Sequence, residues 1–268
     1  MVIQAQTLHH WLSHFYGYGS WNAPIWFVNY EDGGGDLPED VADKLDYFAG
    51  AHPSVMEPVL ADIRELYKHA ALRIEGPKRE TYKNLYDYRF GNKSLLNGVW
   101  KNLIAFAHAF NGEAQPDFHV YQQNEFAFGR EALIKLYPLP APHNHAWYYS
   151  WLDMPQFPFL KSREQYEEHL YPTRIKNIIG NILRYQPELV LMYGMNSINT
   201  LKESFQEQFP AVSFKMIKAE KHVIPQHHLA RLDKTTLVLT TQIPALRHGR
   251  KETGFDWGAF GTALTLKR

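Results

Sequence analysis

The sequence predicts an α/β protein of three layers, in which helices cover both faces of a central, mostly parallel sheet. Short apolar runs typical of buried strands alternate with helical segments of a dozen or more residues. That alternation is typical of parallel strands joined by crossover helices. The chain has 268 residues and shows no internal repeat or linker. We therefore expect one domain spanning residues 1–268.

The first half of the chain predicts one buried strand among helices. The strand, IWFVNY at residues 25–30, lies between Pro24 and a run of glycines. The helices are indicated by apolar residues at helical spacing, or by proline and acids in a first turn. The predicted helices cover residues 5–15, 38–49, 57–72 and 93–110, and residues 73–92 are expected to be irregular.

The second half predicts four further strands. They cover residues 131–137, 187–194, 212–224 and 236–244. Helices are expected at 163–186, with a break at Pro172, at 196–209, and in the tail to Arg268. Ligands of parallel sheets bind at the carboxyl ends of the strands. The loops after strands 25–30, 131–137, 187–194 and 236–243 are therefore the most informative.

Composition excludes several classes of function. The 28 basic and 28 acidic residues give no net charge, which gives no support to tight, sequence-independent DNA binding. The absence of cysteine excludes disulfides, thiolate catalysis and cysteine-bound iron–sulfur clusters. No signal peptide or membrane-spanning run is visible, so we expect a cytoplasmic protein with no membrane contact. Aromatic residues make up 15% of the chain, which favours an aromatic core over a stacking surface.

Two acids and three glycines follow the first strand. Glu31 and Asp32 could position a water molecule or stabilise a cation. Gly33, Gly34 and Gly35 allow positive φ and close backbone approach, and their N–H groups could cradle an anion or a carbonyl. The alternative is a tight turn with two solvated acids. The run is neither a P-loop nor a dinucleotide-binding GxGxxG motif.

The next two loops differ in what they offer. After the second informative strand, a proline-stiffened loop carries the Tyr137 ring, which could stack, and the Asn144 amide, which could bind in bidentate fashion. A rigid connection without further function is the alternative. After the third strand, Gly194 turns the chain and Asn196 or Ser197 caps the next helix, which is a structural role.

The loop after the last of these strands supplies further polar side chains. Thr241 and Gln242 can form hydrogen bonds, and Arg247 and His248 can carry positive charge. An ordinary strand exit is the alternative. Histidine pairs elsewhere lack the spacing of a zinc motif, so we expect no metal and no cofactor.

The order of these motifs resembles the uracil-DNA glycosylase superfamily. Residues 29–33, NYEDG, occupy the place of its Gly-Glu-x-Pro-Gly turn. Residues 135–144, KLYPLPAPHN, are similar to the Lys-x-x-Pro-Pro-x-Asn motif of some members. The strand from 187 to 194 begins with proline and ends with glycine, as theirs does. Residues 241–245, TQIPA, stand in the place of Thr-x-His-Pro-Ser/Ala.

The resemblance implies a uracil-DNA-glycosylase-like fold and hydrolysis of the N-glycosidic bond of a base flipped out of DNA, as in DNA repair. Glu31 or Asp32 would place the water, Tyr137 or Tyr30 would stack on the base, and Asn144 would read its edge. The candidate catalytic residues are Glu31, Asp32 and His248. The candidate substrate-binding residues are Asn29, Tyr30, Gly33, Gly34, Tyr137, Asn144, Thr241, Gln242 and Arg247.

The departures from the superfamily pattern keep a second interpretation open. Ile243 stands where the superfamily has a histidine that donates to the leaving base, and isoleucine has no donor. Arg247 or His248 would have to supply that charge. The alternative is a non-catalytic member that binds a nucleotide, a nucleic acid or a protein. An unrelated α/β hydrolase is disfavoured because no Gly-x-Ser-x-Gly motif is present. The base and the oligomeric state stay open.

Overall fold

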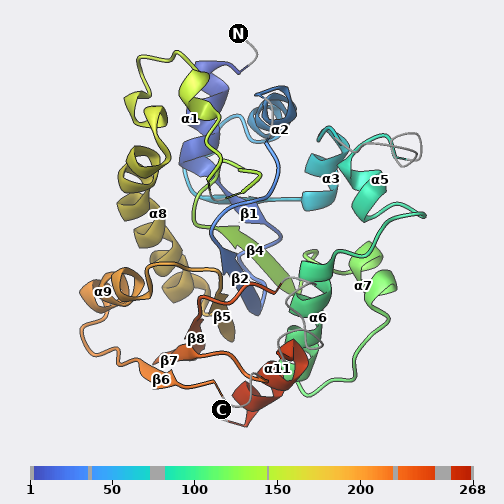
Figure 1. Ribbon diagram of the computed structural model, residues 1–268, viewed down its shortest axis with the longest axis vertical. Helices are drawn as coiled ribbons and strands as arrows, with labels where there is room; N and C mark the ends of the chain where they lie inside the picture. The colour runs from blue at the N-terminus through green and yellow to red at the C-terminus, as the bar shows by residue number, and fades with distance from the viewer. Residues whose placement is uncertain are drawn as a thin grey trace.

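The computed structural model describes residues 3–35, 38–72, 82–143, 145–219, 223–244 and 255–266, which contain one eight-stranded mixed sheet with helices on both sides (Figure 1). The strands lie in the order β3-β1-β4-β2-β5-β8-β7-β6. Their bounds are β1 (Phe15–Tyr18), β2 (Ile25–Asn29), β3 (Val59–Ala61), β4 (Glu131–Lys135), β5 (Leu189–Met192), β6 (Lys215–Ile217), β7 (His227–Leu232) and β8 (Thr235–Leu239).

The centre of the sheet is parallel and its flanks are mixed. Strand β2 pairs in parallel with β4 and β5, and β5 pairs in parallel with β8. In contrast, β1 is antiparallel to β4, and β6, β7 and β8 form antiparallel pairs. The α/β class is thus confirmed, and parallel pairing is found among the four central strands and between β1 and β3 at one edge. Strands β7 and β8 are antiparallel because a two-residue turn joins them, with Asp233 at a φ of 50°.

Helices lie on both faces of this sheet. Figure 1 shows α8 (Arg163–Tyr185) and α9 (Ile198–Gln208) on one side, and α6 (Gly98–Phe110) and α11 (Trp257–Thr265) on the other. The remaining helices are α1 (Ala5–His14), α2 (Pro38–Ala51), α3 (Ile63–Lys68), α5 (Leu85–Arg89) and α7 (Phe118–Asn124), with short 3-10 turns η1 (Tyr149–Trp151) and η2 (Pro158–Lys161). Among the described helices, none has the length and apolar character needed to cross a bilayer.

The core contains much of the aromatic content of the sequence. The rings of Trp11 and Phe15 stack with centroids 3.7 Å apart, and the Phe48 ring meets both of them edge-on. All three side chains are buried. Burial of large rings contributes about 25 cal/mol per Å² of apolar surface removed from water. The aromatic-core interpretation of the composition therefore holds for this cluster.

Several predicted elements differ from the structure. Residues 85–89, expected to be irregular, form α5. Of the strand expected at 212–224, the described residues form only Lys215–Ile217, as β6.

Two predicted helices also differ. The helix expected at residues 57–72 is interrupted, because residues 59–61 pair with β1 as an edge strand. The Asp62 carboxylate then accepts hydrogen bonds from the N–H groups of Arg64 and Glu65 and starts α3. Helix α8 continues through Pro172 without the expected break. Pro172 and Glu168 are both exposed, so the helical hydrogen bond that the proline removes lies on the exposed face of α8.

Candidate functional site

A cleft of about 250 Å³ opens at the carboxyl ends of the four central strands. The strands end level with one another, because the register pairs Asn29 with Lys135, Val28 with Met192, and Met192 with Leu239. The chain passes from β2 to β4 on one side and returns to β5 on the other, so the cleft lies where the strand order reverses. It is lined by Asn29, Tyr30, Glu31, Asp32, Gly33, Ala141, Pro142, His143, Tyr193, Gly194, Asn196, Thr241 and Ile243.

Glu31 lies in this cleft with a raised pKa. Its side chain is 9% exposed and forms an ion pair with Arg163, at the first turn of α8. Arg163 is shared, because its Nε also binds the Glu167 carboxylate at 2.8 Å. Burial raises the pKa of Glu31 more than Arg163 lowers it, to about 7. Glu31 can therefore take up and release a proton near neutral pH.

Asp32, the next residue, has the opposite electrostatic environment. The Tyr18 hydroxyl donates to its Oδ2 at 2.7 Å, and Lys135 Nζ lies 2.5 Å from its Oδ1. Burial raises the pKa of Asp32. The positive charges of Lys135 and Lys44 lower it by more, so the pKa lies below its ordinary value. Asp32 therefore stays ionised, and the two adjacent carboxylates differ in protonation behaviour.

The glycines after these acids differ in what the fold requires of them. Gly33 lines the cleft, and a Cβ there would meet no atom within 4 Å. Gly34 also has open space, but its φ is +101°. At Gly35 the φ is +78° and a Cβ would lie 2.9 Å from the Pro140 carbonyl oxygen and 3.2 Å from the Tyr149 hydroxyl. Gly35 is thus the position at which the turn and the proline-rich loop require glycine.

Of the two tyrosines expected to stack on a ligand, only Tyr30 lines the cleft. Its hydroxyl donates to Glu167 at 2.6 Å, which fixes the ring. Tyr137 is buried, and its ring packs against Tyr30 with centroids 4.8 Å apart. Tyr137 lines a neighbouring pocket of about 300 Å³ between α8 and α9, which also includes Tyr30 and Asn196. Tyr137 therefore packs on the Tyr30 ring and lines the neighbouring pocket rather than the cleft itself.

The last loop places Ile243 at the cleft. Ile243 is 54% exposed, and its Cγ1 would lie 3.3 Å from a Cβ added at Gly194, whose φ is +70°. Thr241 lines the cleft as expected, whereas Gln242 is not among the lining residues and accepts a hydrogen bond at its backbone oxygen from Gly194 N. The candidates Asn144, Arg247 and His248 lie outside the described residues.

Several residues of the cleft were not predicted from the sequence. Arg163 and Tyr18 reach the two acids from distant parts of the chain, and no local pattern marks those contacts. Lys135 begins the KLYPLPAPHN motif, but the motif did not assign it a role at Asp32. Asn196, expected to be a helix cap, lines the cleft, while the Ser197 side chain forms no capping hydrogen bond. The signal that could have identified Asn196 is its place directly after the Gly194 turn of a central strand.

Asn29 supplies a further polar group at the base of the cleft. Its Nδ2 donates to the Glu31 carbonyl at 2.7 Å. Its Oδ1 is buried and has no hydrogen-bond partner among the described residues. Buried polar atoms normally have a partner, so this oxygen is a candidate acceptor for a ligand or water. Within the described part of the chain, no group of three His, Asp or Glu side chains could hold a metal ion.

No family model, curated protein or solved structure matches the chain. The chemistry of the cleft therefore has to be inferred from its own residues.

Proposed function

We propose that the cleft at the ends of β2, β4, β5 and β8 binds a flipped-out nucleobase and that the protein hydrolyses its N-glycosidic bond, with Glu31 as general base. The observation that carries this proposal is the pair of adjacent carboxylates with opposite pKa shifts. Burial raises the pKa of Glu31 to about 7, whereas Lys135 and Lys44 offset the burial of Asp32 and lower its pKa. When two neighbouring carboxyl groups have separated pKa values, the one with the raised pKa is suited to proton transfer and the one with the lowered pKa to stabilising positive charge.

In the proposed reaction, Glu31 accepts a proton from a water molecule whose oxygen bonds to the anomeric carbon of the sugar. The carbon–nitrogen bond breaks, and the base leaves with the bonding electrons. A base that leaves as an anion takes up a proton at the departing nitrogen from Glu31 or from solvent, whereas a base that carried a positive charge leaves neutral and Glu31 releases its proton to solvent. Asp32 stays ionised beside the sugar and favours the positive charge that develops on it.

The size and side chains of the cleft suit a small planar ligand. Its volume of about 250 Å³ is small for a binding pocket, since drug-sized ligands occupy about 300–1,000 Å³. Tyr30 offers a ring fixed by its hydrogen bond to Glu167, and Asn196 and the Asn29 Oδ1 offer polar groups. The four loops that form the cleft carry the motifs that resemble the uracil-DNA glycosylase superfamily.

Ile243 limits the kinds of base that this hydrolysis could release. It lies on the cleft in the place of a histidine donor and cannot stabilise negative charge on a leaving base. A base that leaves readily needs that donor least. We therefore propose alkylated purines, which carry positive charge before the bond breaks, ahead of uracil as substrates.

Ile243 also favours the alternative function, in which the protein binds a nucleotide, nucleic acid or protein in this cleft without catalysis. Without a donor at position 243, and with both acids in ion pairs, the cleft could hold a base without releasing it. The two functions differ in whether base release accompanies binding.

The test uses oligonucleotides that contain uracil, hypoxanthine, 7-methylguanine or 3-methyladenine, with wild type, Glu31→Gln and Glu164→Gln. Glu164 is exposed on α8 and serves as the matched control. We expect wild type and Glu164→Gln to release at least one base, and Glu31→Gln to do so about 10²–10⁴-fold more slowly. Binding without release by wild type would support the alternative. Equal release by Glu31→Gln and wild type would contradict the assignment of Glu31.

A further inference from the structure

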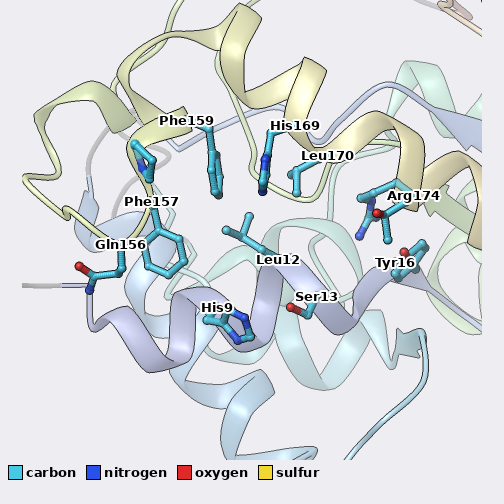
Figure 2. Close-up of a pocket in the computed structure, with 12 residues that line it drawn as sticks. His9, Leu12, Ser13, Tyr16, Gln156, Phe157, Phe159, His169, Leu170 and Arg174 are labelled. Carbon is cyan, nitrogen blue, oxygen red and sulfur yellow. The ribbon is translucent and has the colours of Figure 1, made fainter.

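A second pocket, of about 660 Å³, lies between α1 and the η2–α8 segment (Figure 2). It shares no lining residue with the cleft, so a ligand bound in it would not depend on the proposed function. Its volume is in the range of small-molecule sites, about 300–1,000 Å³. Much of its wall is apolar, formed by Leu12, Phe157, Phe159 and Leu170.

Arg174 lies at one end of this pocket, beside Tyr16, while Phe157 and Phe159 lie toward the other (Figure 2). The arginine side chain is 1% exposed. Its guanidinium lies over the Tyr16 ring at 3.7 Å. The pocket therefore has a cationic end and an aromatic end.

The Arg174 guanidinium is held by carbonyl groups. Its Nε donates to Leu136 O at 2.7 Å, Nη1 to Phe15 O at 2.8 Å and Nη2 to Lys135 O at 2.7 Å. These hydrogen bonds involve three of the five N–H groups of a guanidinium, which leaves one on each Nη atom. No carboxylate of the described residues forms an ion pair with Arg174.

A buried cation held only by neutral groups is costly unless an anion compensates it. The three carbonyl dipoles and the Tyr16 ring face reduce that cost, but they are neutral and do not cancel the positive charge of the guanidinium. An anion entering the pocket would meet this charge where water is partly excluded, and a carboxylate is a planar anion with which a guanidinium pairs well.

We propose that this pocket binds a small amphipathic organic anion, whose carboxylate pairs with Arg174 and whose apolar body packs on Leu12, Phe157 and Phe159. The aromatic walls favour a flat hydrocarbon body. Exposed polar side chains at the rim, among them Ser13 and Thr173, leave the pocket open to solvent.

The test compares two probes of the same shape, 2-naphthoate and the uncharged 2-naphthamide, by isothermal titration calorimetry. We expect wild type to bind the naphthoate at least about tenfold more tightly, because only the carboxylate pairs with the guanidinium. Equal affinities for the two probes, or no binding of either at millimolar concentration, would overturn the proposal.

Matched substitutions at Thr173 and Ser13 locate the site without altering the buried arginine. Thr173→Glu supplies a competing carboxylate beside Arg174 and should abolish the preference for naphthoate, whereas Thr173→Gln should retain it. Ser13→Trp should fill the pocket and weaken both probes at least tenfold. Naphthoate binding that is unchanged in Thr173→Glu or in Ser13→Trp would place the probe elsewhere and contradict the proposal. Circular dichroism checks that each variant is folded.

Discussion

The Arg163 guanidinium binds the Glu31 carboxylate across 132 residues of sequence. This contact joins the first turn of α8 to the loop after β2. The positive charge of Arg163 favours the ionised form of a carboxylate that burial would otherwise leave largely protonated. The pKa of about 7 is thus a balance between burial, which raises it, and one arginine, which lowers it.

Replacing Arg163 should shift that balance. In Arg163→Met the pKa of Glu31 should rise above 7 by roughly one to three units, the usual effect of an opposite charge at contact distance. Carbon-13 NMR of labelled glutamate side chains would measure the midpoint. Arg184→Met is the control, since Arg184 pairs with Glu57 on the exposed surface. An unchanged Glu31 midpoint in Arg163→Met would show that the arginine does not set it.

Replacing Lys135 should destabilise the folded protein, because the buried Asp32 carboxylate loses the ammonium group that contacts it. In Lys135→Met the carboxylate keeps its hydrogen bond from Tyr18 but loses the ammonium 2.5 Å away. A buried charge left without its partner costs about 3–5 kcal/mol. Urea unfolding should show a loss of this size at pH 7 and a much smaller one at pH 3, where Asp32 can take up a proton.

The double variant Lys135→Met with Asp32→Asn is the control, because it removes the unpaired charge. It should recover most of the stability at pH 7. A double variant as unstable as Lys135→Met would assign the loss to packing of the lysine stem rather than to the charge.

The three glycines should respond differently to alanine. Gly33→Ala should change the free energy of unfolding by less than about 0.5 kcal/mol, since that site is open. Gly34→Ala should cost about 1–2 kcal/mol from its positive φ alone. Gly35→Ala should cost about 2–4 kcal/mol, because a clash with Pro140 O is added. Thermal unfolding of the three variants would check the order, and equal losses would contradict it.

The central strands could be predicted from the sequence because their apolar runs end at glycine or proline. Strands β2, β4 and β5 lie within the expected ranges, β8 begins one residue before the expected start at residue 236, and the loops after all four strands line one cleft. Strand β1 was missed because its FYGY sequence continues the apolar spacing of the preceding helix. Strand β7 was missed because its HHLARL sequence contains none of the Val, Ile, Thr, Phe, Tyr or Trp residues that are enriched in strands.

The site could be predicted only as far as local motifs extend. Glu31, Asp32 and Tyr30 follow a strand end and lie in the cleft as expected. The pKa values of the two acids depend on Arg163, Lys135 and Tyr18, which tertiary contacts bring to the acids. Arg163 and Tyr18 carry no local signature, and the motif that begins at Lys135 does not show that its side chain pairs with Asp32. Tyr137 lines the neighbouring pocket instead of the cleft, because successive residues at a strand end point to opposite sides of the sheet and position alone does not decide which side a given ring faces.

Glu131 should make the stability depend on pH. It is fully buried at the start of β4, accepts a hydrogen bond from Tyr121 at 2.7 Å, and has its pKa raised by burial from 4.5 to about 7. The folded state therefore binds more protons than the unfolded state between these values. Stability contributed by the protonated group is present below about pH 4.5 and is lost as the pH rises through 7.

Glu131→Gln should remove this dependence. The variant should be more stable than wild type by about 1–3 kcal/mol at pH 8, and nearly equal to it at pH 4. Urea unfolding at the two pH values measures the difference, with Glu164→Gln as the exposed control. A gain of the same size at both pH values would contradict the explanation.

The most direct test of the central claim is the single-turnover rate of base release at pH 6 and pH 8, using the oligonucleotide that wild type processes best. With a Glu31 pKa of about 7, the ionised fraction and hence the wild-type rate should rise about tenfold between these values. Glu31→Gln should be about 10²–10⁴-fold slower and show no such rise. A pH-dependent rise that persists in Glu31→Gln, or no base release from any of the oligonucleotides, would contradict Glu31 as the general base of an N-glycosidic hydrolase.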